Sequence, residues 1–382
     1  MTHEIVKVIR EIYKTNNFIP LHEPRFDHLE KKYLLQTIES GFVSSAGKQV
    51  TEFENGIKKY IGVKHAIAVT NGTSALHVAL GSIGANQNTE VITQSLTFVA
   101  TCNAISYCNA SPVFVDVSKD TMGMCPVSLS NFLEEKCEVR DDGKCWNKLT
   151  NKKIVACVPM HTYGFPVALD ELKKVCSKFM IPIIEDAAES LGSLYKNKHA
   201  GTIGKISTLS FNGNKIITTG GGGMILTNDD LLSNKMRHIT TTAKIKHEWL
   251  FEHDVVGYNY RLPNLNASLG LAQLEKIDLF VKNKRQIAKI YQDWGSNKYK
   301  FFTEPSNTRS NYWLNVIISN DVNERNHLLK VTNDSKIMTR PAWTPMHKLK
   351  MFNSCYCHDL KNTMWYFDRI VNLPSSVNLD IL

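Results

Sequence analysis

A single lysine lies in a glycine-rich turn between two apolar runs of β type. The first run, 206–211, leads to Lys215, and four consecutive glycines, 220–223, precede the second run, 224–227. Glycines let the backbone adopt positive φ angles and approach a ligand closely. Partial desolvation lowers the pKa of a lysine, and the neutral amine can then attack a carbonyl and form a Schiff base. On this stretch alone, a solvated lysine in a glycine-rich turn is the favoured interpretation.

Other residues that could bind a cofactor follow further apolar runs. The turn 71–74, which contains Gly72, Thr73 and Ser74, opens a helix, and unpaired N–H groups at such a turn can bind phosphate. Asp186 ends the run 181–185, where a carboxylate can hold a protonated ring nitrogen. Taken singly, each residue has an equally good structural explanation, such as a helix cap.

These residues lie in an alternation of strands and helices. The alternation predicts an α/β fold with a mostly parallel, helix-covered sheet in a large domain. Ligands of such sheets bind beyond the carboxyl ends of the strands, where Thr73, Phe98, His161 and Asp186 lie. We expect strands at 66–70, 90–93, 112–117, 154–159, 181–185, 206–211 and 224–227, and helices from 71, from 97 and at 169–179 and 229–237.

The remaining segments divide the chain into two parts. Residues 1–250 are expected to hold an N-terminal crossing segment, with prolines at 20 and 24, and the large, cofactor-binding domain. The insertion 134–153, with eleven Asp, Glu, Lys or Arg residues, is expected to form a surface excursion. Residues 251–382 are expected to hold a helical hairpin, 267–282 and 285–294, and a smaller α/β C-terminal domain.

The order of residues around the lysine resembles that of a known family. Ser210-Phe211-x-x-x-Lys215, followed by glycines at 220, 222 and 223, is similar to the cofactor-lysine segment of the DegT-type sugar aminotransferases, which use pyridoxal 5'-phosphate (PLP). The resemblance covers nearly the whole chain and implies an aspartate-aminotransferase-like architecture, fold type I of the PLP enzymes. Segments 18–25, 157–164 and 338–343 look most like the branch that acts in legionaminic-acid pathways.

The resemblance implies a role for each candidate residue. Lys215 would bind the cofactor and shuttle protons, and Asp186 would face the pyridine nitrogen. Glu189 stands at a position where many family members carry glutamine, and it would affect how the protein contacts the oxygen of the cofactor ring. Asn259 would reach the phosphate site of a neighbouring subunit, which implies a homodimer with shared active sites. The other implied roles are ring stacking by Phe98, phosphate binding by Gly72, Thr73, Ser74 and Ser210, and substrate contacts by His161, Arg261, Arg340 and Trp343.

The implied reaction is a transamination in two halves. Glutamate would give its amino group to the cofactor and leave as 2-oxoglutarate. The amino group would then pass to C4 of a nucleotide-linked (UDP or GDP) 4-keto-6-deoxy-hexose, with a 2-acetamido sugar favoured, in the biosynthesis of amino sugars and surface polysaccharides such as lipopolysaccharide. Some relatives carry histidine in place of the lysine and dehydrate their sugar, so Lys215 favours transamination. A PLP-dependent dehydratase and a non-catalytic regulatory member of the same fold remain alternatives.

Composition argues against several other classes of protein. No apolar run reaches the ~18 residues that span a bilayer, and the N-terminus lacks a signal-peptide pattern, so we expect a cytoplasmic protein with no membrane partner. Nine irregularly spaced cysteines do not form a disulfide framework, and the cluster Cys355, Cys357 and His358 lacks a second ligand pair for zinc. The net charge of +9 comes from scattered lysines, which argues against nucleic acid as a partner.

Overall fold

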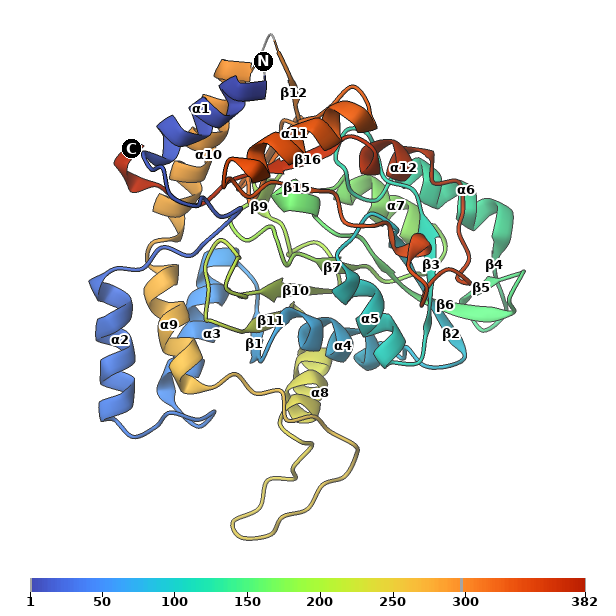
Figure 1. Cartoon of the computed structure of the whole chain (residues 1–382). Helices are drawn as coiled ribbons and strands as arrows, with labels where there is room; N and C mark the ends of the chain where they lie inside the picture. The colour runs from blue at the N-terminus through green and yellow to red at the C-terminus, as the bar shows by residue number, and fades with distance from the viewer. Residues whose placement is uncertain (1, 296–297, 382) are drawn as a thin grey trace.

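The computed structural model describes residues 2–295 and 298–381, which fold into two lobes (Figure 1). The large lobe contains a central sheet in the order β1, β11, β10, β7, β6, β2, β3, in which parallel bridges at Cys157–Ile183 and Met160–Asp186 join β7 to β6. Strand β11 is antiparallel to both of its neighbours, and the other pairings are parallel, which confirms the mostly parallel sheet. The strands are β1 (His65–Val69), β2 (Thr89–Gln94), β3 (Ser111–Val115), β6 (Lys152–Val158), β7 (Ile184–Asp186), β10 (Ile206–Ser210) and β11 (Gly223–Thr227).

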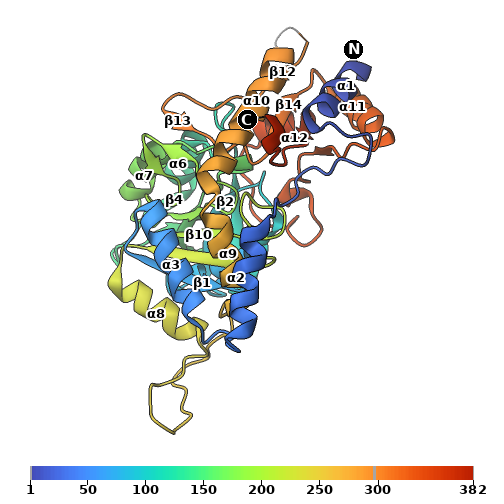
Figure 2. The same cartoon turned by 90° about the vertical axis from the view of Figure 1, so that its left-hand side faces the viewer.

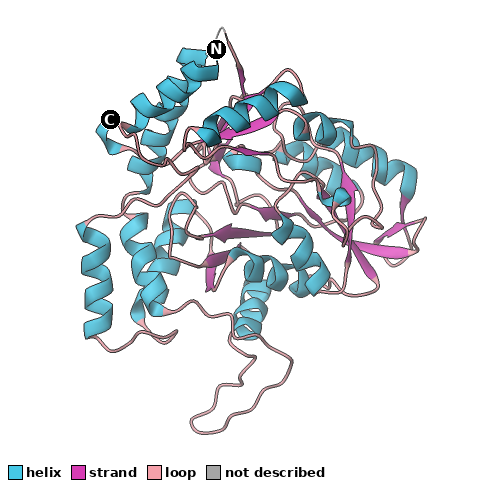
Figure 3. Ribbon diagram, viewed as in Figure 1, coloured by secondary structure: helices cyan, strands magenta, loops and turns pink. Residues whose placement is uncertain are grey.

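Helices cover both faces of this sheet (Figure 3). Along β1, Ala66 and Ala68 pack into one apolar cluster with residues of α3 and α9, whereas Ile67 and Val69 pack into another with residues of α4, α5 and α8. This alternation is the two-residue period of a strand that is buried on both sides. The helices of the large lobe are α2 (His28–Glu39), α3 (Lys48–Ile61), α4 (Gly72–Ser82), α5 (Val99–Tyr107), α6 (Pro126–Lys136), α7 (Leu169–Lys178), α8 (Asp230–Thr240) and α9 (Asn264–Leu274).

The small lobe combines the C-terminal segment with the first helix of the chain. Its antiparallel sheet has the order β12, β14, β16, β15. Residues Ile5, Ile9 and Ile12 of α1 pack with Ile287, Leu328 and Val371, so α1 belongs to this lobe although it precedes the large one in sequence. The elements are α1 (Thr2–Tyr13), α10 (Ile277–Gly295), β12 (Lys300–Phe301), β14 (Asn315–Ile318), α11 (Val322–Asp334), β15 (Arg340–Pro341), α12 (Lys361–Phe367) and β16 (Ile370–Leu373).

The predicted helical hairpin is wrong. Helix α9 ends at Leu274, and α10 runs unbroken through 283–284, where the sequence suggested a link. In both views α10 continues away from the end of α9 and does not fold back on it (Figures 1 and 2). The polar residues Asn283 and Lys284 are buried and hydrogen-bonded. Asn283 donates to the carbonyl oxygen of Asn378, and Lys284 donates to those of Trp313 and Ser375. These two polar side chains therefore make contacts in the core and do not mark a loop between two helices.

Two excursions depart from the layers. The charged insertion forms a hairpin, β4 (Cys137–Val139) and β5 (Cys145–Asn147), that pairs with β6 and extends the sheet, so it is more ordered than the predicted surface excursion. The segment 242–256, which we call the arm, projects beyond α8 (Figure 2). The remaining elements are β8 (Leu194–Tyr195), β9 (Lys198–His199), β13 (Thr308–Arg309), η1 (Thr162–Gly164), η2 (Met346–Lys348) and η3 (Leu379–Ile381). Within residues 2–295 and 298–381, no helix is long and apolar enough to cross a membrane.

Candidate active site

Lys215 is enclosed at the carboxyl edge of the central sheet. It follows β10 in a turn closed by a hydrogen bond from its own N–H to the Asn212 carbonyl. Its Nζ lies 3.5 Å from Oε1 of Glu189 and 4.3 Å from the centre of the Trp313 ring, and the side chain is 11% exposed. Trp313 is held in place because its Nε1–H donates to the Asn214 carbonyl at 2.7 Å. The amine therefore has a carboxylate on one side and an aromatic face on another.

Asp186, at the end of β7, is bonded on both of its oxygens. Thr101 of α5 donates its hydroxyl to Oδ2 at 2.7 Å, and the N–H of Ala188 donates to Oδ1 at 3.2 Å. Burial raises the pKa of Asp186, and the Thr101 hydroxyl, the Ala188 N–H and the charge of Lys215 oppose the shift. A buried carboxyl of this kind gains stability from a nearby cation, which suits the protonated nitrogen of a ring.

The predicted phosphate residues come together from the start of α4 and the end of β10. Asn71 caps α4 by accepting the Ser74 N–H at 2.8 Å. A Cβ on Gly72 would come within 2.9 Å of the Ser210 Cβ, which places the start of α4 directly against the end of β10. A helix N-terminus beside the Ser210 hydroxyl, with Thr73 next to it, is a suitable cradle for a phosphate group.

Phe98 lies at the N-cap of α5 with 48% of its surface exposed. Its ring meets that of Trp343, from the small lobe, edge to face with centroids 6.1 Å apart. Both residues were predicted site residues, and the structure brings them together from opposite lobes. An exposed ring at the edge that carries Asp186 and Lys215 can stack on a planar cofactor.

His161 is a correction to the prediction. Its side chain is fully buried, so it cannot contact a substrate. The Val167 N–H donates to Nδ1 at 3.2 Å, which leaves Nε2 to donate to Glu185 at 3.0 Å. Its own backbone N–H donates to the carbonyl of Asp186 at 3.1 Å. His161 therefore fixes the strand end that carries Asp186, and sequence reasoning mistook a supporting residue for a contacting one.

Glu185 completes this buried network. Its carboxylate also accepts the N–H groups of Gly201, Ile203 and Gly204. Burial alone would raise the pKa of Glu185, but the His161 bond and these N–H donors hold it below its usual value. We call Thr101, His161, Glu185 and Asp186 the floor of the site, in which every carboxylate oxygen has a donor.

Asn259 and Arg261 lie at the outer edge of the sheet. Isolated bridges pair Asn259 with Thr241 and Arg261 with Val69, the last residue of β1. Both side chains are exposed, and the Arg261 guanidinium donates to the Asn259 amide oxygen at 3.3 Å. Arg340, on β15, is exposed and bonds to Asn333. Among the described residues, no hydrogen bond connects Asn259, Arg261 or Arg340 to Lys215, Asp186 or residues 72–74.

A cavity of about 540 Å³ lies between the lobes, and we call it the lobe cavity. Three of its lining side chains carry polar atoms that have no hydrogen-bond partner among the described residues: both ring nitrogens of His22, the hydroxyl of Tyr163 and the amide oxygen of Asn372. Sequence reasoning missed these residues, as it missed Trp313 and Thr101. The predicted residues Arg340 and Trp343 line the same cavity, together with Pro20, Leu21, Asn214, Trp313, Leu314, Met338, Pro341 and Ala342.

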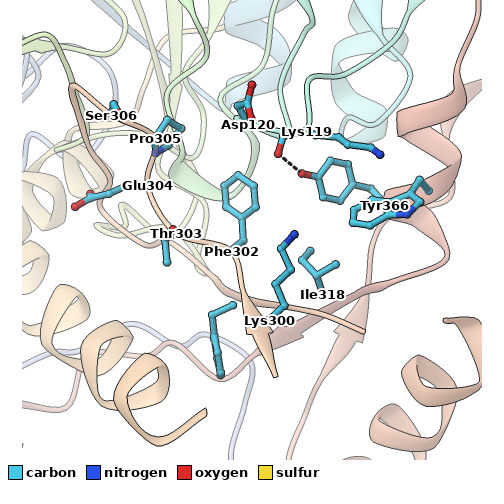
Figure 4. Close-up of a pocket in the computed structure, with 12 residues that line it drawn as sticks. Lys119, Asp120, Lys300, Phe302, Thr303, Glu304, Pro305, Ser306, Ile318 and Tyr366 are labelled. Carbon is cyan, nitrogen blue, oxygen red and sulfur yellow. Dashed lines mark hydrogen bonds between the residues drawn. The ribbon is translucent and has the colours of Figure 1, made fainter. Parts of the chain in front are cut away.

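A second cavity, of about 500 Å³, contains none of the predicted site residues (Figure 4). Tyr366 donates its hydroxyl to the Lys119 carbonyl at 2.7 Å, and Glu304 pairs with Arg285. The Tyr366 hydroxyl and the Glu304 carboxylate are therefore already engaged within the chain. Across residues 2–295 and 298–381, no group of three or more His, Cys, Asp or Glu side chains could hold a metal ion, and all nine cysteines are free.

The geometry defines a class of protein. A lysine beside a buried carboxylate, a phosphate cradle and an exposed ring at the edge of a mostly parallel sheet fit PLP, which supplies an electron sink for amino-group chemistry when bound. Residues 24–381 match the model of the DegT/DnrJ/EryC1/StrS aminotransferase family. The chain belongs to this family, and its cofactor is PLP.

Relatives and solved structures agree with this assignment. The chain is 37% identical to GDP-perosamine synthase of Escherichia coli O157:H7, over 95% of this chain and 94% of that protein, and 36% identical to GDP-perosamine synthase of Vibrio cholerae, over 94% of each. Helicobacter pylori PseC, described as an aminotransferase involved in the biosynthesis of pseudoaminic acid, superposes with a TM-score of 0.85 at 25% identity over 96% of both chains. The predicted α/β fold of PLP-dependent aminotransferases is thereby confirmed. None of these proteins tests the finer prediction of the legionaminic-acid branch.

Proposed function

We propose that this protein transfers the amino group of glutamate to C4 of a nucleotide-linked (UDP or GDP) 4-keto-6-deoxy-hexose, with a 2-acetamido sugar favoured. The placement of Lys215 beside Glu189, at the same sheet edge as Asp186, is the observation that supports it most. The names of the two synthases and of the PseC structure support a sugar as the acceptor. The product would enter the biosynthesis of an amino sugar for a surface polysaccharide.

In this proposal the chain's own residues have separate tasks. Asp186 keeps the cofactor's ring nitrogen protonated, and the start of α4 with Ser210 binds the phosphate. Lys215 moves a proton between substrate carbon and cofactor in each half of the reaction. Trp313 and the lobes shield the amine from water, since little of its side chain is exposed.

The lobe cavity supports a sugar substrate. Its walls include Tyr163, Trp313 and Trp343, and aromatic faces suit the apolar C–H face of a pyranose. Burial lowers the pKa of His22, and the charges of Lys284 and Lys215 lower it further, so His22 is neutral. Neutral groups with free hydrogen-bonding atoms match sugar hydroxyls better than they match a carboxylate, whereas the exposed Arg340 at the rim suits an anion.

The decisive experiment offers the PLP-loaded protein a panel of UDP- and GDP-linked 4-keto sugars with glutamate. We expect one or more amino-sugar products by mass spectrometry, with 2-oxoglutarate formed in equal amount. Borohydride reduction should attach PLP to the peptide that contains Lys215. Attachment to another lysine, or no 2-oxoglutarate with any sugar, would contradict the proposal.

The same measurements separate the alternatives. A dehydratase would consume the sugar without forming 2-oxoglutarate. A non-catalytic regulatory member would lack the absorbance at about 420 nm that is expected of PLP bound to a lysine. The presence of Lys215, Asp186 and Ser210 together favours the aminotransferase.

We further propose a homodimer in which Asn259 serves the phosphate site of the partner subunit. The arm next to Asn259 supports this, because Trp249, Phe251 and Val256 are 70%, 80% and 87% exposed. A projecting segment with this much exposed apolar surface is typical of a contact between proteins. A second copy of the chain, joined through an isologous interface, is the simplest partner.

Complementation tests the shared site. An inactive Lys215→Ala protein is mixed with an Asn259→Asp protein, whose added carboxylate should repel the phosphate. If the sites are shared, a mixed dimer has one doubly damaged site and one intact site, so activity should return on subunit exchange. Demonstrated exchange without activity would show that Asn259 serves its own subunit.

A further inference from the structure

Glu189 is buried and fixed on both its side chain and its backbone next to Lys215. Its side chain is 1% exposed, and Oε2 accepts the Tyr163 N–H at 2.8 Å, which fixes the carboxyl group. The amide of Asn311 donates to the Glu189 carbonyl at 2.9 Å and fixes the backbone. Of its two oxygens, Oε1 is the one that faces Nζ of Lys215, at 3.5 Å. The carboxyl group is thus held at hydrogen-bonding distance from the amine.

Opposing influences act on the pKa of the Glu189 carboxyl. Burial raises its pKa to about 7, the charge of Lys215 and the Tyr163 N–H oppose this, and the charge of Asp186 adds to it. Tyr163 is a second titratable group close to this carboxyl, and burial raises its own pKa. His22, in the crossing segment, is near enough to Lys215 for the lysine charge to lower the His22 pKa. The Glu189 carboxyl therefore takes up a proton near neutral pH more readily than an exposed glutamate does.

We propose that Glu189 and Lys215 act as one proton-holding pair, in which Glu189 stores the proton that Lys215 exchanges. When Nζ gives up a proton, an N–H bond breaks and an O–H bond to Oε1 forms. The pair has zero net charge before and after the transfer, so the buried site never carries an added net charge. This extends the role of Glu189 beyond a contact to the cofactor, and it rests on the proposed function, in which Lys215 binds the cofactor.

Other nearby groups are less suited to the task. Both oxygens of Asp186 are already bonded, to Thr101 and to Ala188, and no hydrogen bond joins Asp186 to Lys215 among the described residues. Glutamine at position 189 could still accept the Tyr163 N–H, but an amide can neither take up the proton nor carry the charge. The identity of residue 189 therefore decides whether the pair exists.

The test is a pH titration of the absorbance of the PLP-loaded protein, which reports the protonation of the Lys215 nitrogen. In Glu189→Gln the negative charge that favours the protonated nitrogen is gone, so we expect the midpoint to fall by about 1 to 3 pH units. Glu189→Asp should restore part of the shift. Asp170→Asn is the matched control, because Asp170 is an exposed carboxylate paired with Lys196, and its midpoint should equal that of the wild type.

An unchanged midpoint in Glu189→Gln would overturn the proposal and leave Glu189 a structural contact. If that variant does not fold, infrared difference spectra of the wild type give the answer. A carboxyl C=O band should appear as the Lys215 nitrogen loses its proton, and its absence would be equally contradictory. Borohydride labelling of a lysine other than Lys215 would instead show that Lys215 does not bind the cofactor, which is a failure of the proposed function.

Discussion

The floor of the site and the lobe cavity are both buried and polar, yet they differ in their hydrogen bonding. In the floor, the carboxylates of Glu185 and Asp186 have a donor for each oxygen. In the lobe cavity, His22, Tyr163 and Asn372 have atoms with no partner among the described residues. Leaving a buried polar atom unpaired costs about 1–3 kcal/mol, so such atoms persist where something else binds them.

This difference separates two kinds of binding. A fully bonded floor keeps one geometry and suits a group that stays in place, as a cofactor does. Unpaired atoms in a cavity between lobes suit a ligand that enters, is converted and leaves. The floor should therefore respond to mutation through stability and chemistry, and the lobe cavity through substrate affinity.

The largest effect is expected at the residue between the two regions. Lys215→Ala should abolish 2-oxoglutarate formation, because among the described residues no other lysine pairs with Glu189. The melting temperature should stay within a few degrees of the wild-type value, since Glu189, whose pKa burial raises to about 7, can take up a proton when its partner is removed and so avoids an unpaired buried charge. Residual turnover above the background without enzyme would show that another residue moves the proton.

Asp186→Asn should lower kcat by at least ~100-fold, which corresponds to about 3 kcal/mol of barrier. An amide keeps the bond from Thr101 but cannot stabilise the charge of a protonated ring nitrogen. PLP should remain bound, as its absorbance in the purified protein would show. Near-normal turnover would mean that Asp186 is not the partner of the ring.

The sheet edge that carries the site could largely be predicted from the sequence, whereas little of the lobe cavity could. Asp186, Phe98 and Thr73 follow apolar runs, and the rule that parallel strands present their carboxyl ends together places them at one edge. His161 obeys the same rule, but the sequence does not reveal that its ring turns inward to Glu185. His22, Tyr163 and Asn372 come from three segments that meet only when the lobes pack, so no local pattern connects them. The link between α9 and α10 was misplaced because buried Asn283 and Lys284 resemble an exposed turn.

Glu185→Gln should destabilise the floor. The variant loses a charge that accepts three backbone N–H groups and His161, and we expect a loss of about 3 kcal/mol in the free energy of unfolding at neutral pH. Since the folded-state pKa of Glu185 is lowered, its contribution is present above the usual value of 4.5 and is lost as the pH falls. Urea unfolding at several pH values measures both effects.

Glu90→Gln is the control for that experiment. Glu90 is a buried glutamate on β2, but burial raises its pKa, so its ionised form adds no stability that acid would remove. The Glu90→Gln variant should still lose free energy of unfolding at low pH as the wild type does. Equal pH profiles for wild type and Glu185→Gln would show that the charge of Glu185 does not hold the floor together.

The smallest and most discriminating effect is expected for Tyr163→Phe, in the lobe cavity. Burial raises the pKa of Tyr163, and its hydroxyl has no partner within hydrogen-bonding geometry among the described residues. Its removal should change the free energy of unfolding by no more than about 0.5 kcal/mol. If the hydroxyl binds the sugar, KM for the nucleotide sugar should rise by up to about tenfold, while KM for glutamate stays the same.

Ser193→Ala is the matched control, because that buried hydroxyl donates to the Gly164 carbonyl and accepts the Asn311 N–H. Its loss should cost about 1–3 kcal/mol of stability and leave both KM values unchanged. A Tyr163→Phe protein that is less stable but has an unaltered KM would place Tyr163 with the floor and remove the distinction between the two regions.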